Sequence, residues 1–328
     1  MTRILRRLDG FLLAMLIAIG LALLRPELGT GDGPLHLGVV TNLGVALVFF
    51  LHGAALSRER LKQGFSHWRL HLFVQASTFV LFPLLGGGAV WAAQGRVPPD
   101  LLLGIFYLTA LPSTISSSVA MTSLGHGNVP AAIFNASLSS LIGMIATPLL
   151  VGLMVSTSGH GLPLGQAMLD IATQLLLPFV VGQALRPWLA DFINRHRAVI
   201  GRIDKAVIVL IVYSSFCDST AAGLWRDYAW WMLLGVGLAV GVLLLLVLLA
   251  TTLGSRLAGF SRADEVTAVF CGSKKSLASG IPMAKLLFAG HPALGLVVLP
   301  IMFYHQLQLV VCSMLARRYA ERAAREGA

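Results

Sequence analysis

The sequence predicts an all-α polytopic membrane protein with ten transmembrane helices. Of its 328 residues, 56% are hydrophobic and only 12% are charged, whereas soluble domains have about 25% charged residues. Apolar stretches of about 20 residues, the length that an α-helix needs to cross a bilayer, recur along the whole chain. This composition excludes a disordered chain, a coiled coil, a disulfide scaffold and nearly every class of soluble enzyme.

The predicted helices follow one another closely, and no linker is long enough to separate a soluble domain. Residues 1–328 are therefore expected to form one membrane domain. The predicted spans are approximately 8–27, 37–56, 70–93, 100–125, 128–155, 166–188, 203–224, 229–254, 263–289 and 293–316. The first resembles a signal peptide, but no small-residue cleavage site follows it, so we interpret it as the first membrane helix.

The basic residues indicate the orientation of the chain. Eighteen of the 24 Lys and Arg lie on the side of the predicted spans that holds both termini, and the opposite side holds Arg25, Arg96 and Arg226. The positive-inside rule explains this distribution, and the net charge of +10, better than nucleic-acid binding does. We expect both termini in the cytoplasm, the lipid bilayer as surroundings, and no nucleic-acid or obligate protein partner. The excess of Arg over Lys and the short loops fit a bacterial inner (plasma) membrane.

A weak internal repeat divides the chain into two halves, approximately 8–155 and 166–316. The first span ends in Leu-Arg-Pro at Pro26 and the sixth at Pro187, while Gly125-His126 matches Gly290-His291. Because five spans separate the halves, they enter the membrane from opposite sides. Inverted repeats with interrupted helices are typical of secondary transporters. Chance similarity between two hydrophobic halves is the alternative.

The fourth predicted span carries a proline and a hydroxyl cluster, namely Pro112, Thr114, Ser116, Ser117 and Ser118. Proline removes a backbone donor and the hydroxyls compete for hydrogen bonds, so we predict a break in this helix. Unwound backbone at membrane depth lines protein or a water-filled cavity. Its oxygens would suit a hard cation or a polar ligand. The alternative is a kink whose serines bond to their own helix.

The ninth predicted span is expected to break at a Lys/Ser/Gly/Pro segment that extends to Pro282. This segment carries Ser273, Lys274, Lys275 and Ser276 between two apolar flanks. A lysine at the centre of a membrane helix costs about 2.5–3.5 kcal/mol on insertion scales, so two adjacent ones need a cavity or partners. Snorkelling of both to an interface is the weaker alternative. We expect Lys285, nearer the outer end, to snorkel.

Other polar side chains inside the spans are candidate ligands for a cation or a substrate: Gln75, Thr78, Asn135, Ser139, Asp218, His305 and Gln306. The alternative is an interhelical hydrogen bond for each and an interfacial position for Asp218. Enzyme motifs and metal-ligand spacings are absent, so we predict no enzyme, no catalytic residue, and no cofactor or metal apart from a sodium ion. The three cysteines are interpreted as buried apolar residues.

Several segments resemble the bile acid:sodium symporter superfamily, most closely the branch typified by the seventh member of solute carrier family 10. They include 270–277, 280–283, 288–291, 216–218 and Tyr304-His305, and the resemblance covers nearly the whole chain. It implies two inverted five-helix repeats, a panel domain of spans 1, 2, 6 and 7, and a core domain of spans 3–5 and 8–10. It also implies that broken spans 4 and 9 cross near the midplane, and that an organic anion is transported by alternating access.

The sequence departs from the superfamily at the cation site. Sodium-coupled members use a glutamate of span 9, where this chain has Phe270, and a glutamine where it has Lys274. Their Ser-Asn pair of span 4 falls on Ser118-Val119, or on Ser117-Ser118 if a residue is inserted. An ammonium about 5 Å from a sodium ion would repel it by about 3 kcal/mol at an effective dielectric constant near 20.

Three functions follow from these features. In the first, a secondary transporter uses Lys274 or Lys275 in place of the cation and couples to protons. In the second, a sodium symporter holds the ion with oxygens of Thr114, Ser117, Ser118, Asn135 and Ser273. In the third, the chain keeps the fold but acts as a non-transporting regulator of ion homeostasis. We predict a transporter of an organic anion, coupled to sodium or protons.

Overall fold

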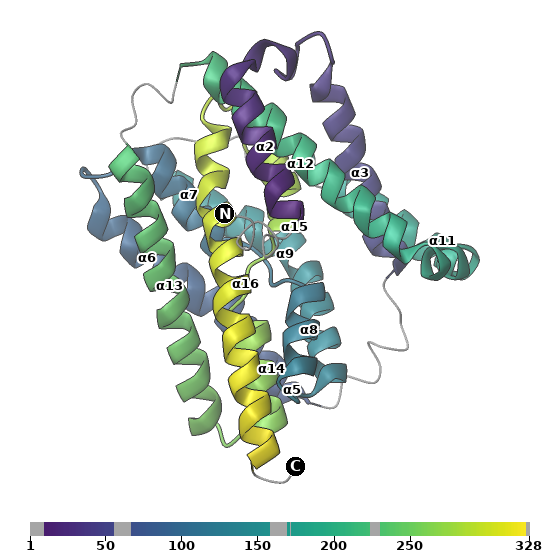
Figure 1. Cartoon of the computed structure of the whole chain (residues 1–328), viewed down its shortest axis with the longest axis vertical. Helices are drawn as coiled ribbons and strands as arrows, with labels where there is room; N and C mark the ends of the chain where they lie inside the picture. The colour runs from purple at the N-terminus through teal and green to yellow at the C-terminus, as the bar shows by residue number, and fades with distance from the viewer. Residues whose placement is uncertain (1–9, 56–66, 158–168, 171, 224–229, 326–328) are drawn as a thin grey trace, which may run out of the picture. The chain divides into compact units, whose positions relative to one another are not determined.

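The structure, a computed structural model, describes residues 10–55, 67–157, 169–170, 172–223 and 230–325, and the regular secondary structure of these residues is helical (Figure 1). Within the described residues, five helices are long and apolar enough to cross a membrane: Leu37–Ala55, Trp68–Ala93, Val129–Val155, Trp231–Leu257 and Leu294–Arg325. Shorter apolar helices cover Leu13–Leu24 and Pro99–Ala110. The all-α polytopic class is confirmed, while the count of ten spans and the inverted repeat stay predictions.

The helices occur in the order of the predicted spans. In the first half they are α2 (Gly10–Leu24), η1 (Pro26–Leu28), α3 (Leu37–Ala55), α5 (Trp68–Ala76), η2 (Ser77–Leu81), α6 (Phe82–Ala93), α7 (Pro99–Ala110), α8 (Ser116–Leu124) and α9 (Val129–Thr157). In the second half they are η3 (Ala172–Leu176), α11 (Leu177–Arg195), α12 (Arg197–Ala221), α13 (Trp230–Leu257), α14 (Arg262–Gly272), α15 (Leu277–Leu287) and α16 (Leu294–Arg325). The basic residues used for orientation at 3, 6, 7, 58, 60, 62 and 226 lie outside the described residues.

The contacts divide the chain into two compact units that alternate along the sequence. The first unit comprises Met1–Leu56, Pro163–Trp230 and Ile281–Val298, and the second comprises Ser57–Leu162, Trp231–Gly280 and Leu299–Ala328. The segment Ile281–Val298 differs from the expected division, which assigns it to the core domain with its neighbours in sequence. Hydrogen bonds explain the difference, because Ser219 Oγ donates to the carbonyl of Pro292 and accepts from the amide of Gly295.

In the first unit, α3 and α11 pack closely through two glycines. A Cβ atom at Gly53 would collide with the backbone carbonyl of Phe179, and one at Gly182 would collide with the carbonyl of Phe50. Small residues at such positions let two membrane helices approach each other, which gains van der Waals contact that lipid cannot replace. The contact therefore requires glycine on both helices.

We expect Gly53→Ala to lower the thermal unfolding midpoint of the purified protein in detergent. The methyl group would meet backbone atoms that cannot rotate away, and overpacking of this kind costs about 1–3 kcal/mol. The matched control is Gly20→Ala in α2, where a Cβ meets no atom within 4 Å. This control should be neutral or slightly stabilising, because alanine is the better helix former. Equal midpoints for the two variants would contradict the close packing.

In the second unit, an apolar cluster joins α5, α9 and α14. Its buried members are Leu70, Val74, Ala131, Ala132, Ala268 and Cys271. All three cysteines of the chain are free and buried, as the sequence predicts. The cluster contains several alanines, so these helices pack at close range.

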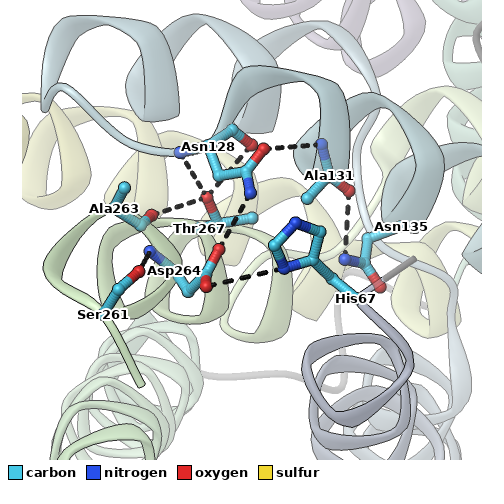
Figure 2. Close-up of polar contacts among 8 residues, drawn as sticks. All are labelled: His67, Asn128, Ala131, Asn135, Ser261, Ala263, Asp264 and Thr267. Carbon is cyan, nitrogen blue, oxygen red and sulfur yellow. Dashed lines mark hydrogen bonds and ion pairs between the residues drawn. The ribbon is translucent and has the colours of Figure 1, made fainter. Parts of the chain in front are cut away.

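The N-terminus of α14 is fixed by polar contacts with α9 and the start of α5 (Figure 2). Ser261 caps the helix by accepting from the amide of Asp264 at 3.2 Å. The Asp264 carboxylate in turn accepts from Asn128 Nδ2 at 2.9 Å and lies 3.7 Å from His67 Nδ1. Asp264 is thus in the first turn of the helix, where the helix dipole favours negative charge. These contacts anchor the helix that leads to the second break.

Candidate functional site

Residues 111–115 interrupt the helix of the fourth predicted span, so that α7 ends at Ala110 and α8 begins at Ser116 (Figure 1). Two side chains of α9 take the place of the lost helical hydrogen bonds. Thr147 Oγ1 donates to the carbonyl of Ala110 at 2.8 Å, and Ser139 Oγ accepts from the amide of Ser113 at 2.9 Å. The break is therefore satisfied by protein groups rather than left open.

Residues 273–276 interrupt the helix of the ninth predicted span, and here too the freed carbonyls have partners. Ser113 Oγ donates to the carbonyl of Cys271 at 2.7 Å, and Ser118 Oγ donates to that of Phe270 at 3.2 Å. Tyr304 of α16 donates its hydroxyl to the carbonyl of Ser273 at 2.7 Å. The break is shorter than the predicted Lys/Ser/Gly/Pro segment, because Pro282 lies inside α15.

Gln308 of α16 holds the second break by bonding to the backbone of Lys275 on both sides. Its Oε1 accepts from the amide of Lys275 at 2.9 Å, and its Nε2 donates to the carbonyl of the same residue at 2.9 Å. The amide side chain thus replaces the pairing that a helix would supply. Gln308 itself is fully buried.

The two breaks are in direct contact within the second unit. The amide of Ser276 donates to the carbonyl of Pro112 at 2.9 Å, so backbone from one break pairs with backbone from the other. Tyr107 near the end of α7 donates its hydroxyl to the carbonyl of Gly280 in α15. A change in the position of one break would therefore be transmitted to the other.

The ammonium group of Lys275 lies among three backbone carbonyl oxygens. Its Nζ donates to Thr78 at 2.9 Å, to Thr109 at 2.7 Å and to Leu111 at 2.6 Å. It also lies 4.1 Å from the centroid of the Phe82 ring, within the range of a cation–π interaction. The side chain is completely buried, which excludes snorkelling to an interface.

The three carbonyls are available because the helices that carry them are irregular. The segment η2 is a π-helix, in which the amide of Phe82 donates to Ser77 instead of Thr78. The next residue, Pro83, has no N–H to offer, so the carbonyl of Thr78 is left for Lys275. Thr109 and Leu111 lie at the end of α7, where the break removes the amides that would otherwise bond to them.

Lys274 is also completely buried, but its ammonium group has a different environment. Its Nζ donates to the carbonyl of Ser117 at 2.9 Å and lies 5.8 Å from the centroid of the Phe270 ring. The hydroxyl of Thr114 lies 2.8 Å from Ser117 Oγ and 2.7 Å from Ser118 Oγ. Among the described residues, neither Lys274 nor Lys275 forms an ion pair with a carboxylate.

Most of the remaining sequence-predicted residues have a hydrogen-bond partner in the described part of the chain. Gln75 Nε2 donates to Asn135 Oδ1 at 3.3 Å, while the hydroxyls of Thr78 and Ser273 bond to carbonyls of their own helices. Ser276 Oγ accepts from the amide of Ser279 in the first turn of α15. Ser116, in contrast, is exposed on α8. These contacts favour the alternative of local hydrogen bonding for most of the hydroxyls.

His305 and Gln306 of α16, both predicted as candidate ligands, have different environments. His305 Nδ1 lies 3.0 Å from Gln308 Nε2, which links this ring to the second break. Gln306 is half-buried and makes no hydrogen bond to the described part of the chain. Gln308 is a polar group inside the tenth predicted span, for which an interhelical hydrogen bond is the expected alternative, whereas Tyr304 and the π-helical segment are not predicted as candidate ligands. Pro83 inside an apolar helix, one turn after Thr78, is the signal that indicates the irregular segment.

Asp218 and Lys285 belong to the first unit. Asp218 Oδ1 accepts from the amide of Gly31 at 3.0 Å, and Lys285 Nζ donates to the carbonyl of Gly38 at 3.1 Å. The two side chains also attract each other electrostatically. The expectation that Lys285 snorkels stays a prediction, and the described contact of its half-buried ammonium group is with a carbonyl of its own unit. Both residues fix the connection between α2 and α3.

The comparisons with known proteins cover almost the entire chain. The SBF-like CPA transporter family matches residues 9–321. YfeH of Escherichia coli strain K12, whose name calls it a candidate symporter, is 45% identical over 317 residues, which cover 97% of this chain and 94% of YfeH. The sodium/bile acid cotransporter 7 of Mus musculus is 33% identical over 316 residues, which cover 94% of this chain and 92% of the mouse protein. An uncharacterised protein of Pseudomonas aeruginosa is 49% identical over 314 residues, which cover 96% of this chain and 93% of that protein.

Proposed function

Because the chain belongs to the SBF-like CPA transporter family, we propose that it is a secondary active transporter that moves an organic anion by alternating access, coupled to sodium or protons. The family makes it an integral membrane transporter of the bile acid:sodium symporter type, not an enzyme. The name of the mouse relative refers to sodium and bile acid. That name supports a bile acid or a similar steroid anion as the first substrate to test here.

One observation supports the proposed preference for anions, namely two buried ammonium groups that have no carboxylate partner among the residues that the structure describes. Lys274 and Lys275 are both fully buried at the contact of the two breaks. Intramembrane ionisable residues are costly and mark substrate or ion pathways by default. An anion about 4 Å from one ammonium gains about 4 kcal/mol at an effective dielectric constant near 20. An organic anion would therefore offset a charge that the protein leaves unneutralised.

The helix N-termini at the two breaks also favour an anionic ligand. Both α8, beginning at Ser116, and α15, beginning at Leu277, start where their predecessor helix has stopped. The N-terminus of a helix carries partial positive charge, and transporters use the N-termini of interrupted helices to hold anionic groups. We therefore place the substrate site at Thr114, Ser117, Lys274 and Ser276. Ser116, Ser118, Ser273 and Lys275 complete the proposed site.

We also propose the architecture and orientation in which this site works. The proposed architecture has ten spans in two inverted repeats, with a core and a panel domain. In the proposed orientation, both termini lie in the cytoplasm of a bacterial cell. The repeat of Pro26 and Pro187, and the two interrupted helices, support the inverted symmetry. The distribution of basic residues supports the orientation.

Uptake into proteoliposomes tests the proposed function. The purified chain, reconstituted and loaded with buffer, is given radiolabelled taurocholate under an inward sodium gradient, an inward proton gradient or no gradient. We expect accumulation above the equilibrium level with one of the two gradients, because a secondary transporter converts the ion gradient into a substrate gradient. Dissipation of that gradient with an ionophore is the control.

The outcome against the proposal is equally clear. Uptake no faster than in protein-free liposomes, for taurocholate and for a panel of steroid sulfates and other organic anions, would contradict it. That result would favour the non-transporting regulator of ion homeostasis.

A further inference from the structure

We infer that the ammonium group of Lys275 is a tethered cation that permanently fills a monovalent-cation site built from backbone carbonyls. Removal of the side chain should then convert this position into a binding site for a free monovalent cation. The inference concerns the second unit alone, and its binding test does not require the protein to transport anything. Only its consequence for ion coupling rests on the proposed function.

The first argument is the match between donors and acceptors. An ammonium group has three N–H donors and no acceptor. The three carbonyl oxygens of Thr78, Thr109 and Leu111 lie 2.6–2.9 Å from Lys275 Nζ, so each donor has one acceptor. The ring of Phe82 at 4.1 Å adds the negative face of an aromatic ring. Every group in contact with Nζ thus attracts a cation.

The second argument is that backbone irregularities, and not the lysine, make the acceptors available. The π-helical hydrogen bond from Phe82 to Ser77 and the missing N–H of Pro83 leave the carbonyl of Thr78 unpaired by its own helix. Thr109 and Leu111 lie where α7 stops. Clusters of backbone carbonyls replace the hydration shell of K⁺ in channels, so a set of this kind can hold a bare monovalent cation.

The third argument is the contrast with the neighbouring residue. Among the described residues, Lys274, equally buried, donates to one carbonyl, that of Ser117 at 2.9 Å. Burial alone therefore does not produce the carbonyl set around Lys275. The two adjacent lysines have separate tasks: Lys275 supplies a fixed charge that holds η2 and α7 together, and Lys274 remains for the substrate.

This assignment has a consequence for ion coupling. A site that already contains a covalently attached cation is closed to sodium in the native protein. The conformational role that a bound ion plays in holding separate helices together is then taken over by the lysine. Coupling to sodium, if it occurs, must use oxygens other than those of Thr78, Thr109 and Leu111.

The test is cation rescue of Lys275→Ala. The variant and the wild type are purified in detergent, in a buffer whose only cation is the large organic cation N-methyl-D-glucamine. Thermal unfolding is then followed while methylammonium, ammonium, K⁺ or Na⁺ is added at constant ionic strength. We expect Lys275→Ala to unfold several degrees below the wild type and to recover most of that shift, saturably, with methylammonium or ammonium. The wild type should not respond to these cations.

The matched control is Lys274→Ala, which removes the same side chain at the next position. It should show no saturable rescue, because a single carbonyl cannot replace the hydration shell of a free cation. If Lys275→Ala is recovered as folded protein only when methylammonium is present during purification, that result also supports the inference. Rescue of both variants to the same extent would indicate a general salt effect and would overturn it.

A second variant keeps the inference falsifiable if Lys275→Ala does not fold under any condition. Lys275→Met retains most of the apolar stem but lacks the charge, so it should fold and be less stable than the wild type. If Lys275→Met is at least as stable as the wild type, or if no cation raises the midpoint of Lys275→Ala, the inference is wrong. Cation rescue without any anion uptake would instead support the inference and contradict the proposed function.

Discussion

Replacement of Gln308 by leucine is expected to cause a large loss of stability. The side chain bonds to both the amide and the carbonyl of Lys275, at 2.9 Å each. Leucine has a similar volume but no polar atom, so both backbone groups would be left without a partner in a buried position. Each unsatisfied buried group costs about 1–3 kcal/mol. Thermal unfolding in detergent and the yield of monodisperse protein measure the loss.

Gln306→Leu is the matched control for this prediction. It makes the same chemical change two residues away on α16, at a half-buried position without a hydrogen bond to the described residues. It should shift the unfolding midpoint little. Because Gln308 also contacts His305, the variant His305→Phe separates the two contributions. If Gln308→Leu and Gln306→Leu unfold at the same temperature, the backbone of Lys275 is not held as the structure shows.

The sequence predicts the positions of the two breaks because their causes are local. Pro112 lacks a donor and is followed by hydroxyl side chains, and the two lysines cannot remain in an apolar helix without partners. These causes act on the residues themselves or on their immediate neighbours. The structure accordingly places the breaks at 111–115 and 273–276.

Candidate partners such as Thr78 are predicted, but the pairing of each one with a particular group of the broken segments is not, because the partners come from helices distant in sequence. Gln308 is 33 residues from Lys275, and Thr78 is 197 residues away. Apolar helices have no polar face from which their rotation could be inferred, so Gln306 and Gln308 are indistinguishable before the structure is known. The different environments of Lys274 and Lys275 are not predicted from the sequence for the same reason. Adjacent residues on a helix break point in directions that only tertiary contacts determine.

The hydroxyls of the two polar clusters differ in their environments. Ser116 is exposed and Ser273 bonds to the carbonyl of Val269 in its own helix, although both lie beside a break. Serine in a membrane helix satisfies itself easily by bonding to a carbonyl one turn back. A cluster of serines therefore predicts the irregular backbone better than it predicts which residues contact a ligand.

Replacement of Lys274 by methionine is expected to separate stability from transport. The ammonium group donates to one carbonyl and has no carboxylate partner among the described residues, so it destabilises the fold more than it supports it. Methionine is unbranched, nearly as long and apolar, and it fills irregular buried space well. Insertion scales give about 2.5–3.5 kcal/mol for the removed charge, and we therefore expect the unfolding midpoint of Lys274→Met to equal or exceed that of the wild type. Thermal unfolding in detergent measures this first part.

The same variant should lose transport of the anion. If the Lys274 ammonium contributes even a third of the about 4 kcal/mol available to an anion at 4 Å, uptake at low substrate concentration falls at least about tenfold. Lys275→Met is the informative comparison, because there the loss of three carbonyl contacts should lower stability as well. If Lys274→Met is more stable than the wild type but inactive, and Lys275→Met is less stable, then the ammonium group that binds the substrate anion is that of Lys274. Wild-type uptake by Lys274→Met would show that the anion does not bind at this ammonium.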